Sequence, residues 1–415
     1  MKNYFRSVFL TLGIASVSHF ACNQEGKDVW QATLLTPASG VIPNQYIVQF
    51  KQAVMHDYKV DQVAKSRQES AQLAQVKLNF FKAKLAAILE GCGIPEQAVN
   101  SYYSELFYGI AATLDQNQLN CLLHHNSVET IENDMEVHLP DFTVVPGPSG
   151  LRAQTTPCGI TNAAGPKDGS ASSKWIWIVD TGIDLDHPDL NVETNPAYAK
   201  SFASGQNTPD DCHGHGTHCA GIAAAKDNSI GVVGVSAGAR VVPVRVLNCQ
   251  GSGQTSWILN GLNHVAANDE PGDVVNMSLG GYWGANCSSQ SSYVTALTNL
   301  SNSGTRIAIA AGNSSDNASY YTPACINASN IHTIASMTCA KAWSSFSNYG
   351  IPPTDWIATG SSVYSTYKKG GYATLSGTSM ASPHVAGIMH YLQSAPVQNG
   401  SVTNGGTTYK IASIQ

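Results

Sequence analysis

The sequence predicts an α/β protein with a parallel β-sheet flanked by helices, preceded in the chain by a small α+β unit. The chain has 415 residues, which is long for one domain and suggests two or three units. In its larger C-terminal part, short apolar runs alternate with helical segments, a pattern typical of parallel sheets covered on both faces. A segment rich in Pro, Gly, Ser and Thr separates the two parts and is typical of a linker.

The first residues have the pattern of a secretory signal, which we assign to residues 1–21. Lys2 and Arg6 precede an apolar stretch from Val8 to Val17, and small residues follow it. Because that stretch is too short to span a bilayer, we expect a secreted protein with no integral membrane span. Cys22 follows directly, and a bacterial lipoprotein anchor through this residue is the minor alternative.

Residues 22–144 form the predicted α+β unit. Gln45–Phe50 has the pattern of a strand, and Val63–Leu89 carries apolar residues at helical spacing. A second pair of strands is predicted at Ile110–Leu114 and Val128–Leu139. This unit therefore has its own sheet and its own helix.

Residues 145–173 form the predicted linker, which we expect to be exposed and open to cleavage. Residues 174–415 then form one α/β domain. Four apolar runs are the candidates for its buried strands: Trp175–Val179, Val241–Leu247, Asp273–Leu279 and Ile307–Ala311. The residues from Ala395 onward are predicted to be a polar tail.

Composition excludes one class of partner and leaves another feature open. The net charge is −6, and Lys and Arg are scattered, so the chain lacks the basic surface that nucleic-acid binding requires. Ten cysteines in an exported chain permit disulfides, although their number fixes no pairing. No heptad pattern is present, and we therefore expect a monomer.

Three segments carry residues suited to chemistry. Asp180 ends a predicted buried strand, where active sites of open α/β sheets gather, although a helix cap or turn is the commoner role of such a residue. His215 begins a helix of small residues. Ser379 stands at another helix N-terminus, where free backbone N–H groups favour developing negative charge; a simple N-cap is the alternative.

The histidine segment also raises the question of a metal site. Three His and two Cys fall within eight positions, and all five are ligand types. The segment contains neither the HExxH pattern nor paired CxxC spacing, while its glycines suit close helix packing. We therefore expect structural roles for His213 and His218, and a chemical role for His215.

Together these strings resemble the subtilase family of serine peptidases. Gly-His-Gly-Thr-His-Cys-Ala-Gly around His215, and Ser-Phe-Ser-Asn-Tyr-Gly at Ser345–Gly350, are most similar to proteinase K-like secreted bacterial members. The resemblance extends from Trp175 to Tyr391, with the Asp, His, Ser order known for subtilisin. It implies a secreted serine endopeptidase of the subtilisin fold, acting on protein or peptide substrates.

The resemblance also implies a role for each matched residue. Ser379 would be the nucleophile, His215 its general base and later the acid, and Asp180 the group that orients the imidazole. Asn313, in Ala-Ala-Gly-Asn-Ser, matches the side chain that donates to the tetrahedral oxyanion, together with the backbone N–H of Ser379. No cofactor is needed for this chemistry.

The family's substrate cleft matches two further strings that present backbone to an extended peptide. One wall would be Gly251, Ser252 and Gly253, and the other Ser278, Leu279 and Gly280. The small residues Ala310, Ala311 and Gly312 would line the primary specificity pocket. We therefore expect broad specificity with a preference for apolar or aromatic residues.

The first unit resembles the family's inhibitory propeptide, with Ile131–Asp134 as its closing strand. This implies an intramolecular inhibitor and a precursor that cuts itself between Pro140 and Ser173. The family often binds structural calcium, and Asp355 aligns roughly with one calcium carboxylate, although an ordinary loop Asp is the alternative.

The resemblance implies a disulfide between Cys212 and Cys249, and an unpaired, buried thiol at Cys219. A second bridge, between Cys325 and Cys339, is also predicted. Cys158 and Cys287 are left without an assigned partner.

Two other functions compete with this interpretation. A sedolisin-like acid peptidase shares the Gly-Thr-Ser string but has Glu in place of the catalytic His, which argues against it here. A catalytically silent relative that binds peptides is the second, since a fold does not establish a function. Such proteins usually lose a triad or oxyanion residue, whereas this chain keeps all of them.

Overall fold

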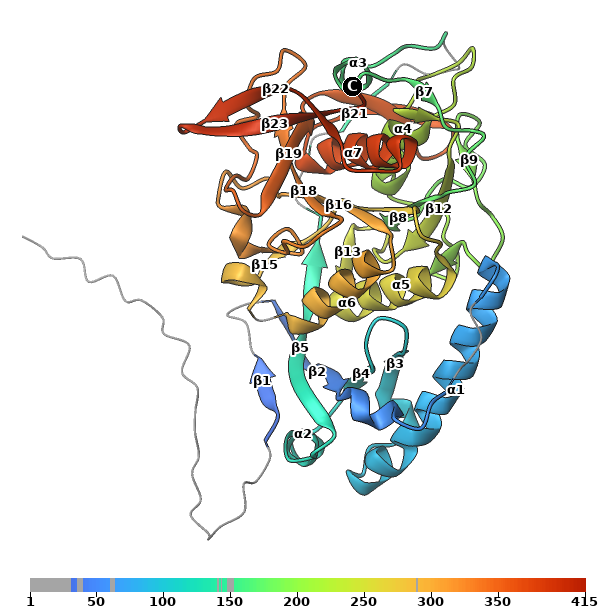
Figure 1. Ribbon diagram of the computed structural model, residues 1–415, viewed down its shortest axis with the longest axis vertical. Helices are drawn as coiled ribbons and strands as arrows, with labels where there is room; N and C mark the ends of the chain where they lie inside the picture. Colours follow the sequence, from blue (N-terminus) through green and yellow to red (C-terminus); the bar gives the residue numbers. More distant parts are fainter. Residues whose placement is uncertain are drawn as a thin grey trace, which may run out of the picture.

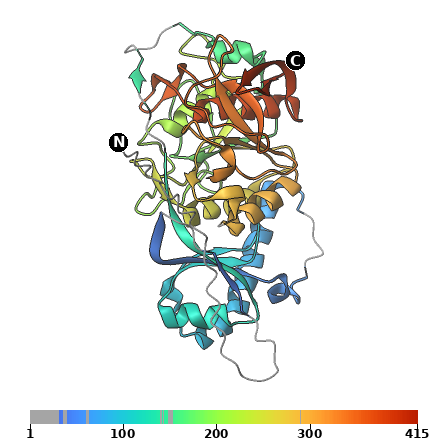
Figure 2. The ribbon, with the colours of Figure 1, turned by 90° about the vertical axis from the view of Figure 1, so that its left-hand side faces the viewer.

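A computed structural model describes residues 31–35, 40–59, 64–139, 142, 144–147, 153–288 and 290–415. The predicted signal at residues 1–21 and Cys22 lie outside the described residues. Two units are visible in Figure 1 and Figure 2: a smaller one, blue to cyan, and a larger one, green to red. None of the helices in the described part of the chain has both the length and the apolarity to cross a membrane.

The smaller unit packs two helices on one face of an antiparallel sheet. Its strands are β1 (Thr33–Leu35), β2 (Val41–Phe50), β3 (Val99–Tyr103), β4 (Gly109–Thr113) and β5 (Val128–His138). In space they follow the order β1-β5-β2-β4-β3. Its helices are α1 (Arg67–Gly91) and α2 (Gln116–Leu123), and 3-10 turns lie at Gln52–Met55 and Glu96–Ala98. The Ser66 side chain caps α1 by accepting from the Glu69 N–H. Phe81 and Leu85 of α1 are buried in the core formed with the sheet.

The predicted strands of this unit are present, but their pairing differs from the expectation. β4 and β5 lie on opposite sides of β2, so they are not neighbours. Both strands pair antiparallel with β2, whose central residues Ile47 and Val48 are buried. Adjacent apolar runs in a sequence identify strands without fixing which strand lies between them.

The larger unit is built on a mainly parallel sheet, as predicted. The spatial order is β10-β12-β8-β14-β16-β18-β19-β23-β22, and the four predicted buried strands appear as β8 (Ile176–Asp180), β12 (Arg240–Arg245), β14 (Val274–Met277) and β16 (Arg306–Ala310). Beside them are β10 (Lys200–Ser201), β18 (Ile331–Met337) and β19 (Thr354–Thr359). β12, β8, β14, β16 and β18 pair in parallel, which brings their carboxyl ends to one edge.

Helices cover both faces of this sheet because successive strand residues point to opposite faces. On one side, Ile176 and Ile178 of β8 pack in a core with α4 (His215–Ala224) and α7 (Thr378–Leu392). On the other, Trp177 and Val179 pack with α5 (Thr255–Asn268) and α6 (Ser291–Asn302). Shorter elements complete the unit: α3 (Cys158–Asn162), β6 (Val145–Pro146), β7 (Lys167–Asp168), β9 (Asn191–Val192), β11 (Ser236–Ala237), β13 (Ser252–Gln254), β15 (Gly281–Tyr282), β17 (Tyr321–Thr322), β20 (Val363–Tyr367), β21 (Gly371–Leu375), and 3-10 turns at Ala285–Cys287 and Ala318–Tyr320.

The predicted polar tail after Ala395 is wrong. β22 (Val397–Asn404) and β23 (Thr407–Ser413) form a hairpin, and β23 joins the edge of the main sheet beside β19. Tyr409 and Ile411 are buried there, whereas Lys410 between them is exposed. One buried face on an otherwise polar hairpin is a weak sequence signal, which is why composition alone suggested a tail.

Much of the predicted linker is folded onto the larger unit, although many of its described residues, such as Val145 and Pro146, are exposed as predicted. β6 pairs with β21, and β7 pairs with β11. The N–H of Thr155 donates to the carbonyl of Gly231, and Cys158 forms a disulfide with Cys339. Backbone pairing with distant strands gives these polar residues fixed positions that their composition does not reveal.

The cysteine predictions are confirmed in part. Cys212 and Cys249 are bridged, with Cα atoms 5.2 Å apart, and Cys219 is free and buried. The predicted Cys325–Cys339 bridge is wrong, because Cys325 bonds Cys287 and Cys339 bonds Cys158. A fourth disulfide, Cys92–Cys121, joins the end of α1 to α2 in the smaller unit.

Candidate active site

The three predicted triad segments meet at the carboxyl edge of the parallel sheet. Asp180 is the last residue of β8, and His215 is the first residue of α4. The imidazole Nδ1 lies 2.8 Å from Asp180 Oδ1 and 3.0 Å from Oδ2, and both side chains are almost fully buried. This contact fixes the orientation of the ring and leaves Nε2 directed away from the carboxylate.

Ser379 is the second residue of α7 and is only 4% exposed. Its hydroxyl donates to the carbonyl of Ser278 at 3.3 Å. Among the described residues no hydrogen bond joins this hydroxyl to His215, so the side chain has to turn before it can pass a proton to the imidazole. Catalytic hydrogen bonds are often made only when substrate is present.

The carboxamide of Asn313 is held by the residue before Ser379. The Thr378 N–H and the Thr378 hydroxyl both donate to Asn313 Oδ1, each at 2.8 Å. Because the oxygen is engaged twice, the amide assignment leaves the Nδ2 donor free for another acceptor. Asn313 and Ser379 line the same cavity, so this donor and the backbone N–H at the start of α7 face a common space.

Asp211 is the residue that sequence reasoning missed. Its carboxylate is buried and receives hydrogen bonds from the Thr181 hydroxyl, from the backbone N–H groups of His213, Gly214 and Thr217, and from the Thr217 hydroxyl. It thereby ties the loop after Asp180 to the first turn of α4. Asp211 lies three residues before Gly214, the N-cap of α4, so its position in the sequence does not match the usual capping pattern.

The predicted substrate residues fall into two groups. Ser278, Leu279, Gly280, Ala310, Ala311 and Gly312 line one cavity of about 100 Å³ together with Asn313 and Ser379. Gly251, Ser252 and Gly253 lie outside that lining and belong to a strand edge at β13. The arrangement offers a pocket for one side chain and a backbone edge for an extended chain.

The edge at β13 is occupied by the smaller unit. β5 runs antiparallel to it, with His138 opposite Ser252 and Val137 opposite Gly253. The N–H of Leu139 donates to the carbonyl of Gly251 at 2.9 Å. Figure 1 shows β5 as a long cyan arrow that leaves its own sheet and enters the larger unit.

The chain beyond β5 reaches the triad. The ring of Phe142 lies 5.5 Å from that of His215 and 5.8 Å from that of His213, measured between centroids. Leu139 is therefore bound at the β13 edge, and Phe142, three residues later, lies beside His215 of the triad. Val137, His138 and Leu139 pair with this edge in the antiparallel manner that a bound peptide substrate would use.

The described residues contain one cluster of three metal-ligand types, and it includes two residues of the triad, Asp180 and His215. Asp180, His215 and Cys219 place one ligand atom each within 4.8 Å of one another. The carboxylate and imidazole already contact each other, and burial raises the pKa of the Cys219 thiol well above its usual value. A protonated thiol is a poor ligand, so the cluster does not fit a metal ion.

Of the neighbouring histidines, His218 is fully buried and His213 is half-buried, and both have lowered pKa values. Burial lowers the pKa of His218 to about 3, and its Nε2 lies 3.1 Å from the carbonyl oxygens of Val363 and Ala373. Burial lowers the pKa of His213, and the nearby His215 lowers it further. Neither ring contacts a carboxylate through a hydrogen bond in the described part of the chain.

Asp355 is engaged in a structural contact. Its carboxylate accepts from the N–H of Thr333 at 2.9 Å, and burial raises its pKa to about 6. No group of three acidic, His or Cys side chains in the described residues includes it. Calcium at this position would depend on carbonyl oxygens and water for its remaining ligands.

Comparison with known proteins places this geometry in a family. Residues 173–404 match the subtilase family, and residues 45–140 match the peptidase inhibitor I9 family. The chain is 33% identical to a cuticle-degrading protease of Metarhizium anisopliae, over 88% of this chain and 84% of that protein. It is 35% identical to proteinase R of Parengyodontium album, over 70% of this chain and 71% of that protein.

A crystal structure of a cold adapted subtilisin-like serine proteinase is 35% identical, with a TM-score of 0.48, and the match covers 55% of this chain and 78% of that one. The family matches span both units, because the inhibitor match ends at residue 140 and the subtilase match begins at residue 173. The chain therefore belongs to the subtilase family and is a serine endopeptidase of the subtilisin type, with an I9 propeptide as its smaller unit.

Proposed function

We propose that this peptidase is made as a self-processed zymogen and that Ser379, His215 and Asp180 carry its reaction. The observation that supports the proposal best is the Asp180–His215 contact at the start of α4, beside the first turn of α7. His215 takes the proton of Ser379 as the hydroxyl attacks the scissile carbonyl, and returns it to the leaving amine. Water then enters by the same route and releases the acyl group.

Negative charge on the carbonyl oxygen would be held by two donors. One is the backbone N–H of Ser379 at the start of α7, and the other is Asn313 Nδ2. Thr378 supports this role, since it fixes Asn313 through the amide oxygen. A donor that is already oriented needs no reorganisation as charge develops.

We infer broad specificity with a preference for apolar or aromatic residues. The cavity beside Ser379 is lined mainly by small residues, including Ala310, Ala311 and Gly312, and its wall carries no Lys, Arg, Asp or Glu. The antiparallel edge of Gly251, Ser252 and Gly253 would bind the backbone of the substrate, with little dependence on its side chains.

The smaller unit acts as an intramolecular inhibitor in this proposal. β5 occupies the β13 edge. Two buried carboxylates on β5, Asp134 and Glu132, contact helices of the larger unit. Asp134 accepts from the N–H and the hydroxyl of Ser256 in the first turn of α5, and Glu132 accepts from Ser291 and Ser292 at the start of α6. The contacts of the propeptide at the groove exclude other peptides from it.

Self-processing would cut the chain between Leu139 and Phe142. Leu139 is hydrogen-bonded to the groove, and the ring of Phe142 lies beside His215, which supports a cut in the chain that joins these two residues. Most of this interval lies within residues 140–173, the range in which the sequence predicted the cut. Folding of the chain from Ala153 onward against the larger unit disfavours the later part of that range.

Several finer assignments complete the proposal. The signal at residues 1–21 would export the protein, and four disulfides are suited to an oxidising compartment. We propose a secreted monomer without a membrane span. Structural calcium at Asp355 is the one metal assignment retained.

Covalent labelling tests the function directly. A fluorophosphonate probe is expected to label the mature wild-type enzyme at Ser379 and to leave Ser379→Ala unlabelled. The Ser379→Ala precursor is also expected to stay uncut when no other protease is present. A folded wild-type protein that takes no label would instead support the silent peptide-binding relative.

A further inference from the structure

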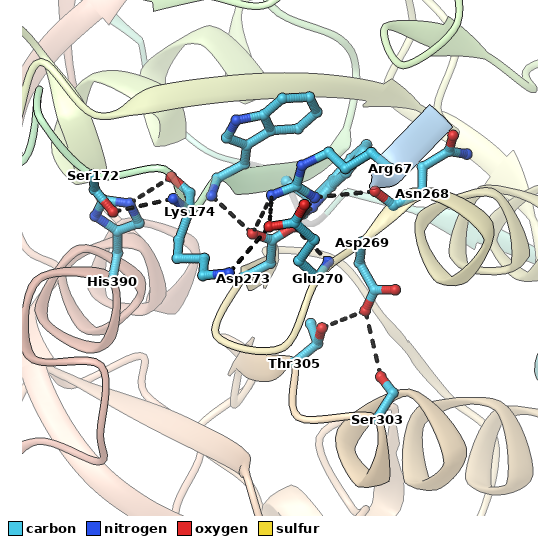
Figure 3. Close-up of polar contacts among 12 residues, drawn as sticks. Arg67, Ser172, Lys174, Asn268, Asp269, Glu270, Asp273, Ser303, Thr305 and His390 are labelled. Atoms are coloured by element: carbon cyan, nitrogen blue, oxygen red, sulfur yellow. Dashed lines mark hydrogen bonds and ion pairs between the residues drawn. The ribbon is translucent and has the colours of Figure 1, made fainter. Parts of the chain in front are cut away.

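The propeptide contacts the larger unit at a second place, far from the groove. Arg67, the first residue of α1, reaches into the larger unit and is only 7% exposed. Figure 3 shows its guanidinium above Asp273, with Asn268 and Glu270 beside it. These partners come from the end of α5 and from the loop that leads into β14.

The guanidinium makes contacts that suit its planar, forked shape. Nη1 donates to Asp273 Oδ2 at 2.5 Å and to the Asn268 carbonyl at 3.0 Å, while Nη2 donates to Asp273 Oδ1 at 2.8 Å. Glu270 lies 3.6 Å from Nη2. The ring of Trp175 stacks on the group, with its centroid 3.9 Å from the guanidinium carbon.

The larger unit prepares this site with its own donors. Asp273 is fully buried, and its oxygens also accept from the N–H of Trp175, the indole N–H of Trp177 and the N–H of Glu270. Three fixed donors hold the carboxylate in place without neutralising it. Among the described residues, Arg67 is the only cation within ion-pair distance of Asp273.

The site lies at the opposite end of the strands from the active site. Asp273 immediately precedes β14, and Ser278, in the wall of the substrate cavity, immediately follows it. Trp175 precedes β8 in the same way, and Asp180 ends it. Five residues of extended chain place the two ends roughly 16 Å apart.

Arg67 is itself well enclosed, at 7% exposed, but α1 does not pack closely against α5 in the turns that follow it. A cavity of about 260 Å³ lies between α1 and α5, lined by Ala71 and Gln75 on one side and by Asn263 and Asn268 on the other. Close packing of apolar groups therefore does not hold this end of α1. The polar contacts of Arg67 do.

We propose that Trp175, Asn268, Glu270 and Asp273 form a guanidinium-binding site that retains the propeptide, through Arg67, after the chain has been cut at the triad. The inference rests on the proposed self-processing. Cutting between Leu139 and Phe142 frees one end of the propeptide, whereas the Arg67 contact at the other end of the sheet stays intact. Retention would delay the appearance of activity after cleavage.

The test measures two time courses in the full chain, one of cleavage and one of activity. Gel electrophoresis measures the appearance of the cut chain, and a soluble peptide substrate measures the appearance of activity; the interval between them is the lag. Arg67→Ala is expected to be cut at the wild-type rate and to shorten the lag about 100-fold or more, because it leaves Asp273 buried without its cation. Arg67→Lys is expected to shorten the lag as well, since an ammonium cannot make the bidentate, stacked contact.

A matched control uses the same helix. Lys84 on α1 forms its ion pair with Asp57 inside the propeptide, and Lys84→Ala is therefore expected to keep the wild-type lag. Asp273→Asn should shorten the lag from the other side of the contact, and combining it with Arg67→Ala should add little, because both remove one interaction.

The outcomes separate the two levels of the proposal. A wild-type chain that is never cut would contradict the self-processing on which the inference rests, whatever Arg67 does. A wild-type chain that becomes active as it is cut would keep self-processing and overturn the retention of the propeptide. A wild-type lag together with unchanged lags in Arg67→Ala and Arg67→Lys would overturn the anchor alone. If Arg67→Ala gives no folded precursor, Arg67→Lys decides: a lag equal to that of the wild type overturns the guanidinium site.

Discussion

Buried carboxylates stand at helix N-termini both in the active site and at the propeptide interface, but they belong to different units. At the active site Asp211 belongs to the same unit as α4 and accepts hydrogen bonds from the hydroxyls of Thr181 and Thr217. At the interface Asp134 and Glu132 of the propeptide serve α5 and α6. In the proposed maturation, release of the propeptide would leave the first arrangement in place and remove the second.

The two regions also differ in the state of their carboxylates. Burial raises the pKa of Glu132 to about 7 and raises that of Asp134, so desolvation opposes their charged forms in the complex. Asp211 has five donors around one carboxylate. The comparison suggests that the active site is held permanently, while the interface is built from contacts that solvent can replace.

Loss of Asp211 is expected to have the largest effect on stability. Asp211→Ala would leave buried donors of Thr181 and Thr217 without their acceptor, at a cost of about 3–5 kcal/mol. Urea unfolding in the uncut Ser379→Ala background would measure this. Asp210→Ala is the control, because the neighbouring Asp210 is exposed; equal losses in the two variants would contradict a special role for Asp211.

Loss of the oxyanion donor is expected to affect catalysis without disturbing the fold. Asn313→Ala should lower kcat by about 100- to 1,000-fold, the range found for the corresponding donor of subtilisin, with little change in KM. Steady-state kinetics on a soluble peptide substrate provide the measurement. Ser315→Ala, at an exposed position nearby, is the control, and an unchanged kcat in Asn313→Ala would remove Asn313 from the mechanism.

Loss of a removable cap is expected to affect only the interface. Asp134→Ala should speed release of the propeptide about tenfold, the effect of losing one helix cap, and leave kcat/KM of the mature enzyme unchanged. The lag between cleavage and activity measures the release. Glu136→Ala removes an exposed carboxylate of the same strand, and a lag as short as that of Asp134→Ala would argue against capping.

The smallest effect is a dependence of release on pH. Glu132 has a pKa of about 7 when buried and an ordinary value near 4.5 when free, so the complex binds protons more tightly than the separated parts. Its contribution is fully present below pH 4.5 and is lost as pH rises through about 7.

Release should therefore be faster at pH 8 than at pH 6, by at most about tenfold in total, because the dependence levels off above pH 7. The lag of the wild type, compared with that of Glu132→Gln across this range, provides the measurement. A flat lag in the wild type, or an equally steep one in Glu132→Gln, would show that Glu132 does not control release.

The sequence by itself determined the fold class of the larger unit and the order of its candidate catalytic residues. The strings around Asp180, His215 and Ser379 are local, and each occurs at a strand end or helix start that periodicity also identifies. These strings also indicated the family, and the resemblance to it implied the Cys212–Cys249 bridge and the free Cys219. Short-range signals of this kind survive because the residues that carry them are neighbours in the chain.

Only the tertiary structure decided which distant residues meet. The bridge from Cys158 to Cys339, the hairpin of β22 and β23 on the sheet edge, and the contact of Arg67 with Asp273 each join parts of the chain that composition leaves unrelated. The Arg67 contact spans 206 positions. Such pairs depend on how helices and strands pack around a shared core, and local propensity contains no record of the residue that will lie opposite.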